Sequence, residues 1–402
     1  MAMTMSQPMN HVFSDNEFQM SDHESMSLQK LRQSVFGLQQ FPEGRLLRWL
    51  RACGGDVNQT SLALRKHLIF RKAWQLDELT RWKMPSVLDK YLGYGYCGPD
   101  NDGGPVLVSP FGNQDVEGIF KSCQSQEYIK FCLMVIERGM QKCEQLAANT
   151  RRPYERMTIV FDLEHMTFEH FNCKPFAATF LTLIALYQEH YPLLLKKIYL
   201  INAPSMAQYT YKVLLPFLSD ETKQLVEIPG DNWLDVISEK IPLDNWPAVL
   251  GGGLEHPEDF NHFHHATDVC QECRVPETYY VDWSSNGRDD FHEEITVYPG
   301  YKHLIEVDVD VPGSRLFWSY ATLTEDIGFA VYYDLRGSDG GSSKGTTDLT
   351  TVYPNIRLEC SVVPVTGSIV CDAPGKYVIE FDNTYSWFSA KELRYTIDVI
   401  EP

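Results

Sequence analysis

The sequence predicts an α+β multidomain protein with an N-terminal helical bundle, a central α/β unit and a C-terminal all-β sandwich. Its 402 residues are enough for two or three domains at about 150 residues each. The hydrophobic share of 44% and the charged share of 22% are typical of a globular chain. Near residue 255 the apolar pattern changes from mixed helix and strand periods to strict alternation. That change indicates two halves of different architecture.

The charge and the apolar runs exclude several classes of protein. The chain has 35 basic and 54 acidic residues and a net charge of −19. Because an acidic surface repels phosphate backbones, we expect no nucleic-acid partner. The most apolar run, 176–187, is about half of the ~20 residues that a membrane span needs. The N-terminus lacks the apolar core of a signal peptide, and the ten cysteines are expected to be mostly free thiols, so we expect a cytoplasmic protein.

Two segments lack a regular apolar period. Residues 1–40 are rich in Met, Ser and Gln, and they predict a flexible tail that turns helical toward Leu28. Residues 255–275 predict a polar linker. The linker contains zinc-ligand residue types, but a polar hinge between domains is the favoured interpretation, so we assign no metal site. The residues left open as ligands are His262, His264, His265, Cys270 and Cys273.

Residues 41–92 predict a small helical bundle. Within 45–53, three leucines and a tryptophan form one apolar face, and three arginines, Arg48 among them, fall on the other face. Two glycines end this helix. Asp56 is placed to cap a second helix, which is expected to run to about Trp74.

Residues 93–254 alternate between short apolar runs and longer helical patterns. Strands are predicted at 105–109, 157–163 and 197–202, and helices at 127–143, 176–190 and 208–218. Strands that alternate with helices predict an α/β unit with a covered sheet. The helix over 176–190 is apolar on nearly all sides. This excess indicates either a thick core or a cavity for an apolar ligand.

After Pro276 the apolar period becomes two. Apolar and polar residues alternate over 305–311, 377–381 and 393–399, and glycine-rich or proline-containing turns separate these runs. Half-buried strands joined by turns predict a β-sandwich over 276–402.

Common enzyme motifs are missing from the sequence. It contains no phosphate-binding G-x-x-x-x-G-K-[ST] loop, no G-x-S-x-G nucleophile and no H-E-x-x-H metal motif. Glu164–His165 and Glu169–His170 flank a predicted turn, where histidines are usually solvated. We therefore expect a non-enzymatic protein without a cofactor.

Several segments, in order along the chain, resemble the CRAL-TRIO lipid-binding family. They are LLRWLRAC (46–53), DNDGGPV (100–106), IVFDLEHM (159–166), EHYPLLLKKIYLINAP (189–204), LPFLSDETK (215–223) and WPAVLGG (246–252). In the C-terminal part, RVPETYY (274–280), IGFAVYY (327–333) and APGKYVIEFDNTYSWFSAKELRYTIDV (373–399) resemble the GOLD domain, a jelly-roll-like sandwich. The resemblance implies a cytosolic carrier that holds a hydrophobic lipid in an apolar pocket closed by a mobile helix.

The resemblance also implies which residues form the site. Those that match inward positions of the pocket are Tyr96, Leu107, Met157, Ile159, Phe161, Ile198 and Leu200. Tyr96 would offer one hydroxyl to a ligand headgroup. The gate matches about 213–225, and its residues expected to face the bilayer when open are Val213, Leu214, Phe217 and Leu218. Ordinary core packing is the alternative for each pocket residue.

Departures from the family pattern indicate the class of ligand. Leu193 and Leu225 replace two charged residues of the members that bind phosphatidylinositol, and Met157 and Ile159 replace the small hydroxyl residues of the members that bind phosphatidylcholine. Burying a phosphate without hydrogen-bond donors is costly. We therefore expect a sterol precursor, a tocopherol-like isoprenoid or an acyl lipid.

Two functions from different classes stay open at this point. The first is binding and transfer of a lipid, with transient contact to a membrane surface and with the GOLD domain as a membrane or protein contact module. The alternative is a vesicle-trafficking or signalling scaffold, in which the GOLD domain binds a partner protein and the pocket senses a lipid, including a phosphoinositide. A weaker third hypothesis is an activator that delivers substrate to a membrane enzyme.

Overall fold

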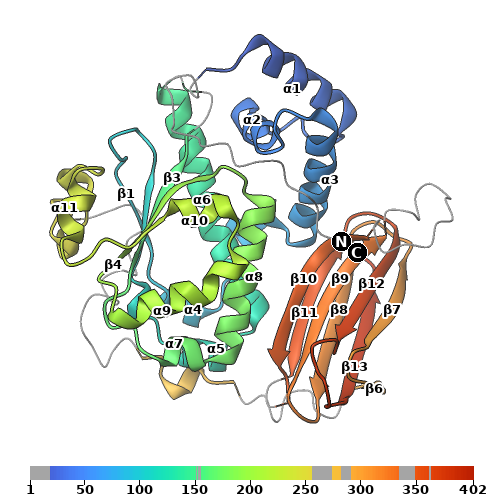
Figure 1. Ribbon diagram of the computed structural model, residues 1–402. Helices are drawn as coiled ribbons and strands as arrows, with labels where there is room; N and C mark the ends of the chain where they lie inside the picture. The colour runs from blue at the N-terminus through green and yellow to red at the C-terminus, as the bar shows by residue number, and fades with distance from the viewer. Residues whose placement is uncertain are drawn as a thin grey trace.

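The computed structural model describes residues 19–150, 152, 155–255, 274–281, 291–334, 349–361 and 364–402. Figure 1 shows N-terminal helices above, a sheet with its helices on one side, and a β-sandwich on the other. The N-terminal helices are α1 (Asp22–Ser34), α2 (Glu43–Ala52), α3 (Val57–Ala73), the 3-10 helix η2 (Leu76–Arg81) and α4 (Ser86–Tyr91).

Helix α1 confirms the turn to helix near Leu28, but it begins earlier than expected, at Asp22. Ser21 and Glu24 form a reciprocal capping box at its start, which satisfies two backbone donors. Leu28 and Leu31 are buried against α2 and α3 in one cluster. The apolar spacing in this segment is sparse, but the cap and these two leucines are sufficient to dock the helix.

The next two helices agree with the sequence in outline. The side chain of Asp56 accepts hydrogen bonds from the amides of Asn58 and Gln59, as a cap for α3. Arg48, on the face of α2 away from the leucines, is only 4% exposed. Arg48 faces α6 (Ser125–Thr150), because it lines a small cavity together with Cys143 of that helix, and helical period alone does not reveal this neighbour.

The central sheet has five strands in the order β1-β2-β3-β4-β5, with β1 antiparallel to β2 and the remaining pairs parallel. The strands are β1 (Gly95–Cys97), β2 (Val106–Ser109), β3 (Met157–Asp162), β4 (Leu195–Ile201) and β5 (Val226–Glu227). The helices of this unit are α5 (Val116–Ser122), α6 (Ser125–Thr150), α7 (Glu169–Asn172), α8 (Lys174–His190), α9 (Ser205–Leu214), α10 (Asp220–Leu225) and α11 (Trp233–Ser238). Short 3-10 helices are η3 (Phe111–Asn113), η4 (Leu215–Phe217), η5 (Leu243–Asn245), η6 (Ala248–Leu250) and η9 (Glu277–Tyr279).

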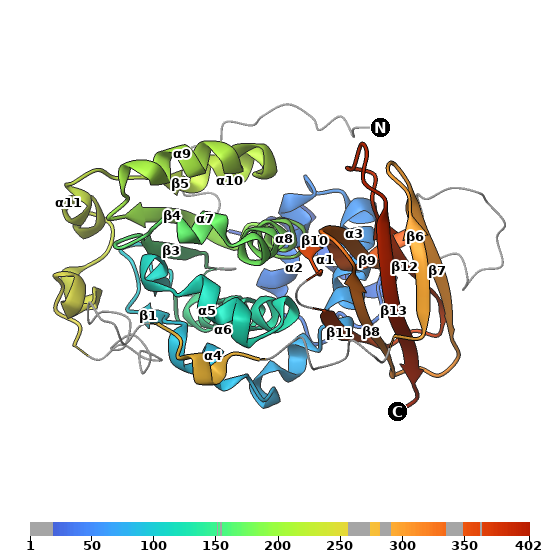
Figure 2. The same ribbon diagram turned by 90° about the horizontal axis from the view of Figure 1, so that it is seen from below.

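The two faces of this sheet are covered differently. One face packs Val160 and Tyr199 against α11 and the segment up to Leu250. The other face packs Met157 and Ile159 into the large cluster that contains α6 and α8. In Figure 2, α11 lies on one side of the sheet, and α8, α9 and α10 lie toward the other side.

The C-terminal part is a sandwich of two four-stranded antiparallel sheets, in the orders β10-β9-β12-β7 and β11-β8-β13-β6. The strands are β6 (Glu293–Val297), β7 (Lys302–Val309), β8 (Ser314–Thr322), β9 (Asp326–Asp334), β10 (Leu349–Glu359), β11 (Val365–Cys371), β12 (Gly375–Asp382) and β13 (Lys391–Ile400). Between the sheets, the Tyr320 ring of β8 lies 4.8 Å from Phe329 and 5.3 Å from Phe381 of the other sheet, centroid to centroid. Such aromatic contacts fix the sheet-to-sheet packing.

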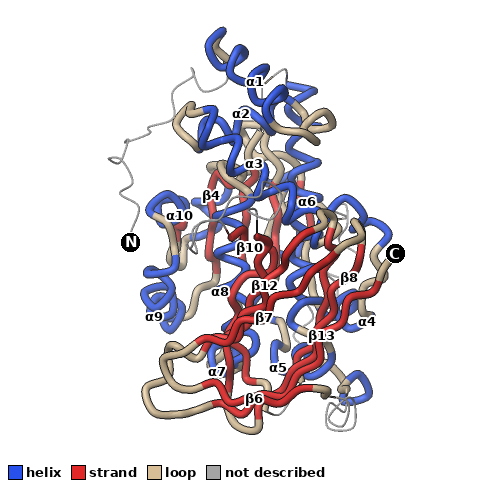
Figure 3. The backbone as a smooth tube through the Cα atoms, turned by 90° about the vertical axis from the view of Figure 1, so that its right-hand side faces the viewer, coloured by secondary structure: helices blue, strands red, loops and turns tan. Residues whose placement is uncertain are grey.

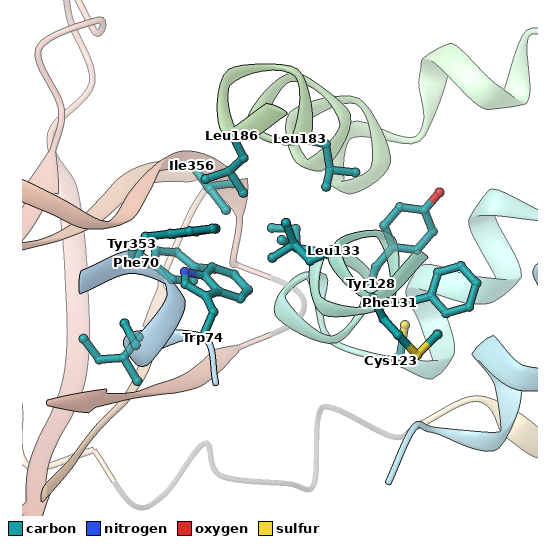
Figure 4. Packing of buried hydrophobic residues seen from close by; sticks show 14 of the residues in the cluster. Phe70, Trp74, Cys123, Tyr128, Phe131, Leu133, Leu183, Leu186, Tyr353 and Ile356 are labelled. Atoms are coloured by element: carbon teal, nitrogen blue, oxygen red, sulfur yellow. The ribbon is translucent and has the colours of Figure 1, made fainter. Parts of the chain in front are cut away.

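The sandwich docks directly on α3 and α8. The Trp74 ring at the end of α3 stacks on Tyr353 of β10 with centroids 5.4 Å apart, and its Nε1 donates to Val352 O at 3.1 Å. Figure 4 shows these two rings beside Ile356 and Leu186. One continuous apolar cluster therefore runs from the sheet unit into the sandwich.

Two further expectations concern the described residues alone. The eight cysteines among them are free thiols, and no helix among them is both long and apolar enough to cross a membrane.

Candidate functional site

The residues expected to line a pocket lie on one face of the central sheet. One row across the strands runs through Tyr96, Leu107, Ile159 and Ile198, which are direct partners in adjacent strands. The next row pairs Phe161 with Leu200. Because opposite residues of neighbouring strands share a face, the structure brings these side chains together on the face toward α6 and α8.

Burial decreases along these rows. Tyr96, Leu107 and Ile159 are at most 5% exposed, and Met157 is fully buried. The side chains of Phe161, Ile198 and Leu200 are only half-buried. The buried end of the site therefore lies at β1 to β3, and the less covered end lies at β4.

The half-buried side chains of Ile198 and Leu200 in β4 are the informative feature. This strand lies between β3 and β5, and its opposite face buries Tyr199 and Ile201 almost completely. Ile198 and Leu200 on the near face keep part of their apolar surface exposed. Parallel sheets are normally covered on both faces. This face of β4 therefore lacks a complete cover of protein atoms.

Helix α8 and the following segment face this part of the sheet. Phe111 of η3 links β3 to α8, because its ring lies 5.7 Å from Phe161 and 5.9 Å from Phe180, centroid to centroid. Phe180 and Tyr187 of α8 are themselves half-buried. The site thus has aromatic side chains on both the sheet and the helix.

The segment matched to the gate divides differently from the expectation. The predicted helix over 208–218 is α9, which ends at Leu214, followed by the turn η4. Pro216 explains the break, because it has no amide hydrogen to continue the ladder. Val213 and Phe217 are 53% and 50% exposed, whereas Leu214 and Leu218 are half-buried.

Gln188 of α8 holds this segment in place. Its side-chain amide donates to Phe217 O at 3.1 Å. Its carbonyl oxygen accepts from the Ser219 amide and from the Thr222 hydroxyl. Sequence reasoning missed this residue, because a polar side chain on a helix does not reveal which segment it contacts.

The polar groups of the site are bonded within the protein. The Tyr96 hydroxyl donates to Val135 O of α6 at 2.6 Å, so in this structure it is engaged with the backbone. The Tyr187 hydroxyl donates to Cys132 O at 3.4 Å, and burial raises the pKa of Tyr187 well above its usual range. Leu193 and Leu225 are half-buried and bring no charge. None of the lining side chains is charged, and the Nζ atom of Lys142 in α6 lies 5.1 Å from the centroid of the Tyr96 ring.

Two cavities lie elsewhere in the described part of the chain. One of about 200 Å³ lies between α2 and α6, lined by Arg45, Arg48 and Cys143 among others. A wider groove of about 540 Å³ lies between α6 and the sandwich, lined by Gln126 and Trp318 among others. None of the expected pocket residues lines either cavity.

The metal alternative is not tested by the structure. His262, His264, His265, Cys270 and Cys273 all lie outside the described residues. Within the described ranges, no group of three or more His, Cys, Asp or Glu side chains is arranged to hold an ion.

Known proteins that are similar to this chain indicate its family. The family model of the CRAL/TRIO domain matches residues 89–252. A relative from Caenorhabditis elegans, "Protein ctg-1", is 44% identical over 383 residues, which is 94% of this chain and 96% of the relative. A "CRAL-TRIO domain-containing protein" from the same organism is 24% identical, over 80% of this chain and 45% of its own length. "Protein real-time" of Aedes aegypti is 25% identical, over 88% of this chain and 57% of its own length.

The chain therefore spans nearly all of the first relative and about half of the other two. Among solved structures, "Crystal structure of Sfh5" is similar with a TM-score of 0.46 and 14% identity, over 59% of this chain and 90% of that chain. At that level of similarity the neighbour supports no argument about the site.

Proposed function

The chain belongs to the CRAL/TRIO domain family, whose members bind and transfer hydrophobic lipids, and we propose on that premise that it carries a lipid of low polarity between membranes. The lipid is a sterol precursor, a tocopherol-like isoprenoid or an acyl lipid, and the protein performs no chemistry on it. The observation that carries this proposal is the incomplete cover of Ile198 and Leu200 on an interior strand.

The ligand site uses the sheet face described above. The proposed lining residues are Tyr96, Leu107, Met157, Ile159, Phe161, Ile198 and Leu200. A lipid tail against Ile198 and Leu200 would complete the cover of β4. Each methylene moved from water to such a surface contributes about 0.8 kcal/mol, so a long apolar tail binds without a charged contact.

The absence of charge at the site supports the choice of ligand class. The two lysines of β4 are engaged, because Lys196 pairs with Asp100 at 3.0 Å and Lys197 pairs with Glu227 at 2.7 Å. The positions Leu193 and Leu225 are apolar. A phosphate headgroup beside Ile198 and Leu200 would lose its hydration without a charged lining side chain to bind it.

The gate is proposed to be α9 with η4 and α10, in which Val213, Leu214, Phe217 and Leu218 meet the bilayer when the segment opens. The C-terminal sandwich is proposed to be a GOLD domain that makes membrane or protein contacts. A carrier needs both a closed state that hides the lipid and an open state that exchanges it.

The direct test is Ile198→Trp. The indole would occupy the space offered to the lipid, so we expect lipid loading to fall to about a tenth of that of the wild type or less. Native mass spectrometry with lipid extraction measures loading after incubation with mixed vesicles. Leu234→Trp is the matched control, because Leu234 is half-buried against the opposite face of the sheet. Equal loading of folded Ile198→Trp and wild type would refute this site.

A further inference from the structure

One end of the sandwich carries several exposed apolar side chains, which we name the aromatic tip. Trp387 and Phe388 are adjacent in the chain and are 86% and 96% exposed. The other members, all at least 49% exposed, are Tyr298, Tyr301 and Leu323. Single exposed apolar residues are common, but a group of them marks an interaction site.

The tip is formed by three turns that lie together. They connect β6 to β7, β8 to β9, and β12 to β13. The Gly300 amide donates to Asn383 O, and the Asn383 amide donates to Tyr301 O, each at 3.0 Å. The Leu323 amide donates to Glu392 O at 3.0 Å. Side chains far apart in the sequence are thereby placed on one end of the fold.

The turn that carries Trp387 and Phe388 is held rigidly from below. Asn383 is fully buried, and its side-chain amide donates to Val297 O and to Ser389 O, each at 2.9 Å. The Tyr385 hydroxyl donates to Asp326 O at 2.9 Å. A turn whose conformation is fixed before contact loses less conformational entropy on binding.

The tip lies on the same side of the molecule as the proposed gate. Figure 2 shows α9, α10 and the turn between β12 and β13 along the upper edge, and Figure 3 shows α9, α10 and this end of the sandwich at the left. Within the gate segment, Tyr209, Val213 and Phe217 are 72%, 53% and 50% exposed. One flat surface can therefore meet both groups at once.

The charges beside the tip are compensated. Lys302 bonds to Glu380 at 2.9 Å and lies 3.3 Å from Asp382. Lys391 is 1% exposed and pairs with Glu325. Neither lysine is a free cation for an acidic partner, and the chain as a whole carries a net charge of −19. Attraction at the tip is therefore apolar, and an anionic surface gains nothing.

We propose that the aromatic tip docks on the surface of a lipid bilayer with neutral headgroups and so presents the gate to that bilayer. Tryptophan and tyrosine favour the interface between water and acyl chains, where one part of the ring is apolar and the other is polar. The proposal rests on the proposed function in lipid transfer. It adds a second membrane contact, on the sandwich, to the gate itself.

The test compares Trp387→Ser/Phe388→Ser with the wild type in flotation with phosphatidylcholine vesicles. We expect the double variant to bind vesicles about tenfold more weakly, because two rings lose their transfer from water. Raising the salt concentration should change wild-type binding little. Phe36→Ser is the matched control: Phe36 is 93% exposed and follows α1, at the opposite end of the molecule from the tip (Figure 1).

Lipid loading by native mass spectrometry separates this proposal from the proposed function. Normal loading with weakened vesicle binding in the double variant alone supports the tip as the docking site. Equal vesicle binding of the double variant and wild type overturns it, as does a wild type that loads lipid but does not float with vesicles, which would leave the tip to a protein partner. Failure of wild-type loading counts against the carrier function and not against docking.

Discussion

At the residue scale, two buried histidines mark the junction of α3 and α8. His67 and His190 are 1% and 4% exposed, and their ring centroids are 5.5 Å apart. His190 also stacks on Phe70 at 3.9 Å. Among the described residues, neither Nδ1 atom has a hydrogen-bond partner. Burial lowers the pKa of His67 well below its usual range and lowers the pKa of His190 to about 3, so both rings fold in the neutral form.

This pair predicts a loss of stability in mild acid. The unfolded chain binds a proton on each histidine below about pH 6.5, whereas the folded chain does not until a much lower pH. The contribution of the two neutral histidines to the free energy of unfolding is therefore fully present above about pH 6.5 and is lost as the pH falls below it. From about pH 7.5 to about pH 5.5, each histidine should cost about 1.4 kcal/mol of unfolding free energy. Urea unfolding at the two pH values measures the loss.

His190→Phe isolates one of the two contributions. The new ring keeps the stack on Phe70 and cannot take a proton, so the loss between the two pH values should shrink by about 1.4 kcal/mol. Comparing each protein with itself at the two pH values removes any packing change. An unchanged loss in the variant would mean that His190 is not held neutral by the fold.

At the element scale, α9, η4 and α10 form a segment that Gln188 ties to α8. Its side chain makes hydrogen bonds with Phe217, Ser219 and Thr222 at the protein surface. Gln188→Ala should therefore favour the open segment by about 1–2 kcal/mol, the net value of a few such bonds. Trypsin cleavage at Lys212 and Lys223 should accelerate about tenfold, and lipid exchange between vesicles should accelerate with it.

The control for this prediction keeps the carbonyl oxygen and its two bonds. Gln188→Glu retains the acceptor for Ser219 and Thr222 and loses only the donor to Phe217 O. It should lie between wild type and Gln188→Ala in its cleavage rate. If all three proteins are cleaved equally fast, Gln188 does not hold the segment closed.

The elements themselves could largely be predicted from the sequence. The periods predict a strand over 157–163 and a helix over 176–190, and the structure has β3 at Met157–Asp162 and α8 at Lys174–His190. Alternation along a strand shows which residues share a face, but it cannot show which face another strand or helix covers. A helical period has the same limit, so the sequence does not reveal that Arg48 is buried or that Gln188 contacts Phe217.

The candidate site could be predicted from the sequence only through its resemblance to the CRAL-TRIO family. Matched motifs located Ile159, Ile198 and the other strand residues, and the pairing register then places them in rows on one face. The incomplete cover of β4 follows from the positions of α8, α9 and α10, which no local pattern encodes. The same is true of the aromatic tip, because Tyr298 and Trp387 are brought together by turns.

At the whole-molecule scale, the sandwich is part of the same core as the lipid-binding unit. In the sequence Trp74 and Tyr353 are indistinguishable from core residues of their own domains. In the structure they stack on each other, and Lys174 of α8 pairs with Glu359 of β10 at 3.1 Å. A continuous apolar cluster joins the two parts. The sandwich thus restrains α8, which also carries Gln188, the residue that contacts the proposed gate.

This shared core predicts that the described domains unfold as one cooperative unit, and Trp74→Ala tests it. The substitution removes the stack on Tyr353 and the bond to Val352 O, and it should cost about 3–5 kcal/mol, as truncation of a buried aromatic does. Phe381→Ala, wholly inside the sandwich, should cost a similar amount. Scanning calorimetry should show one transition for wild type, one lower transition for Phe381→Ala, and two for Trp74→Ala, because only that variant breaks the junction. Two transitions in the wild type would mean that the sandwich folds independently and cannot restrain α8, whereas one transition in Trp74→Ala would mean that Trp74 is not what couples the two parts.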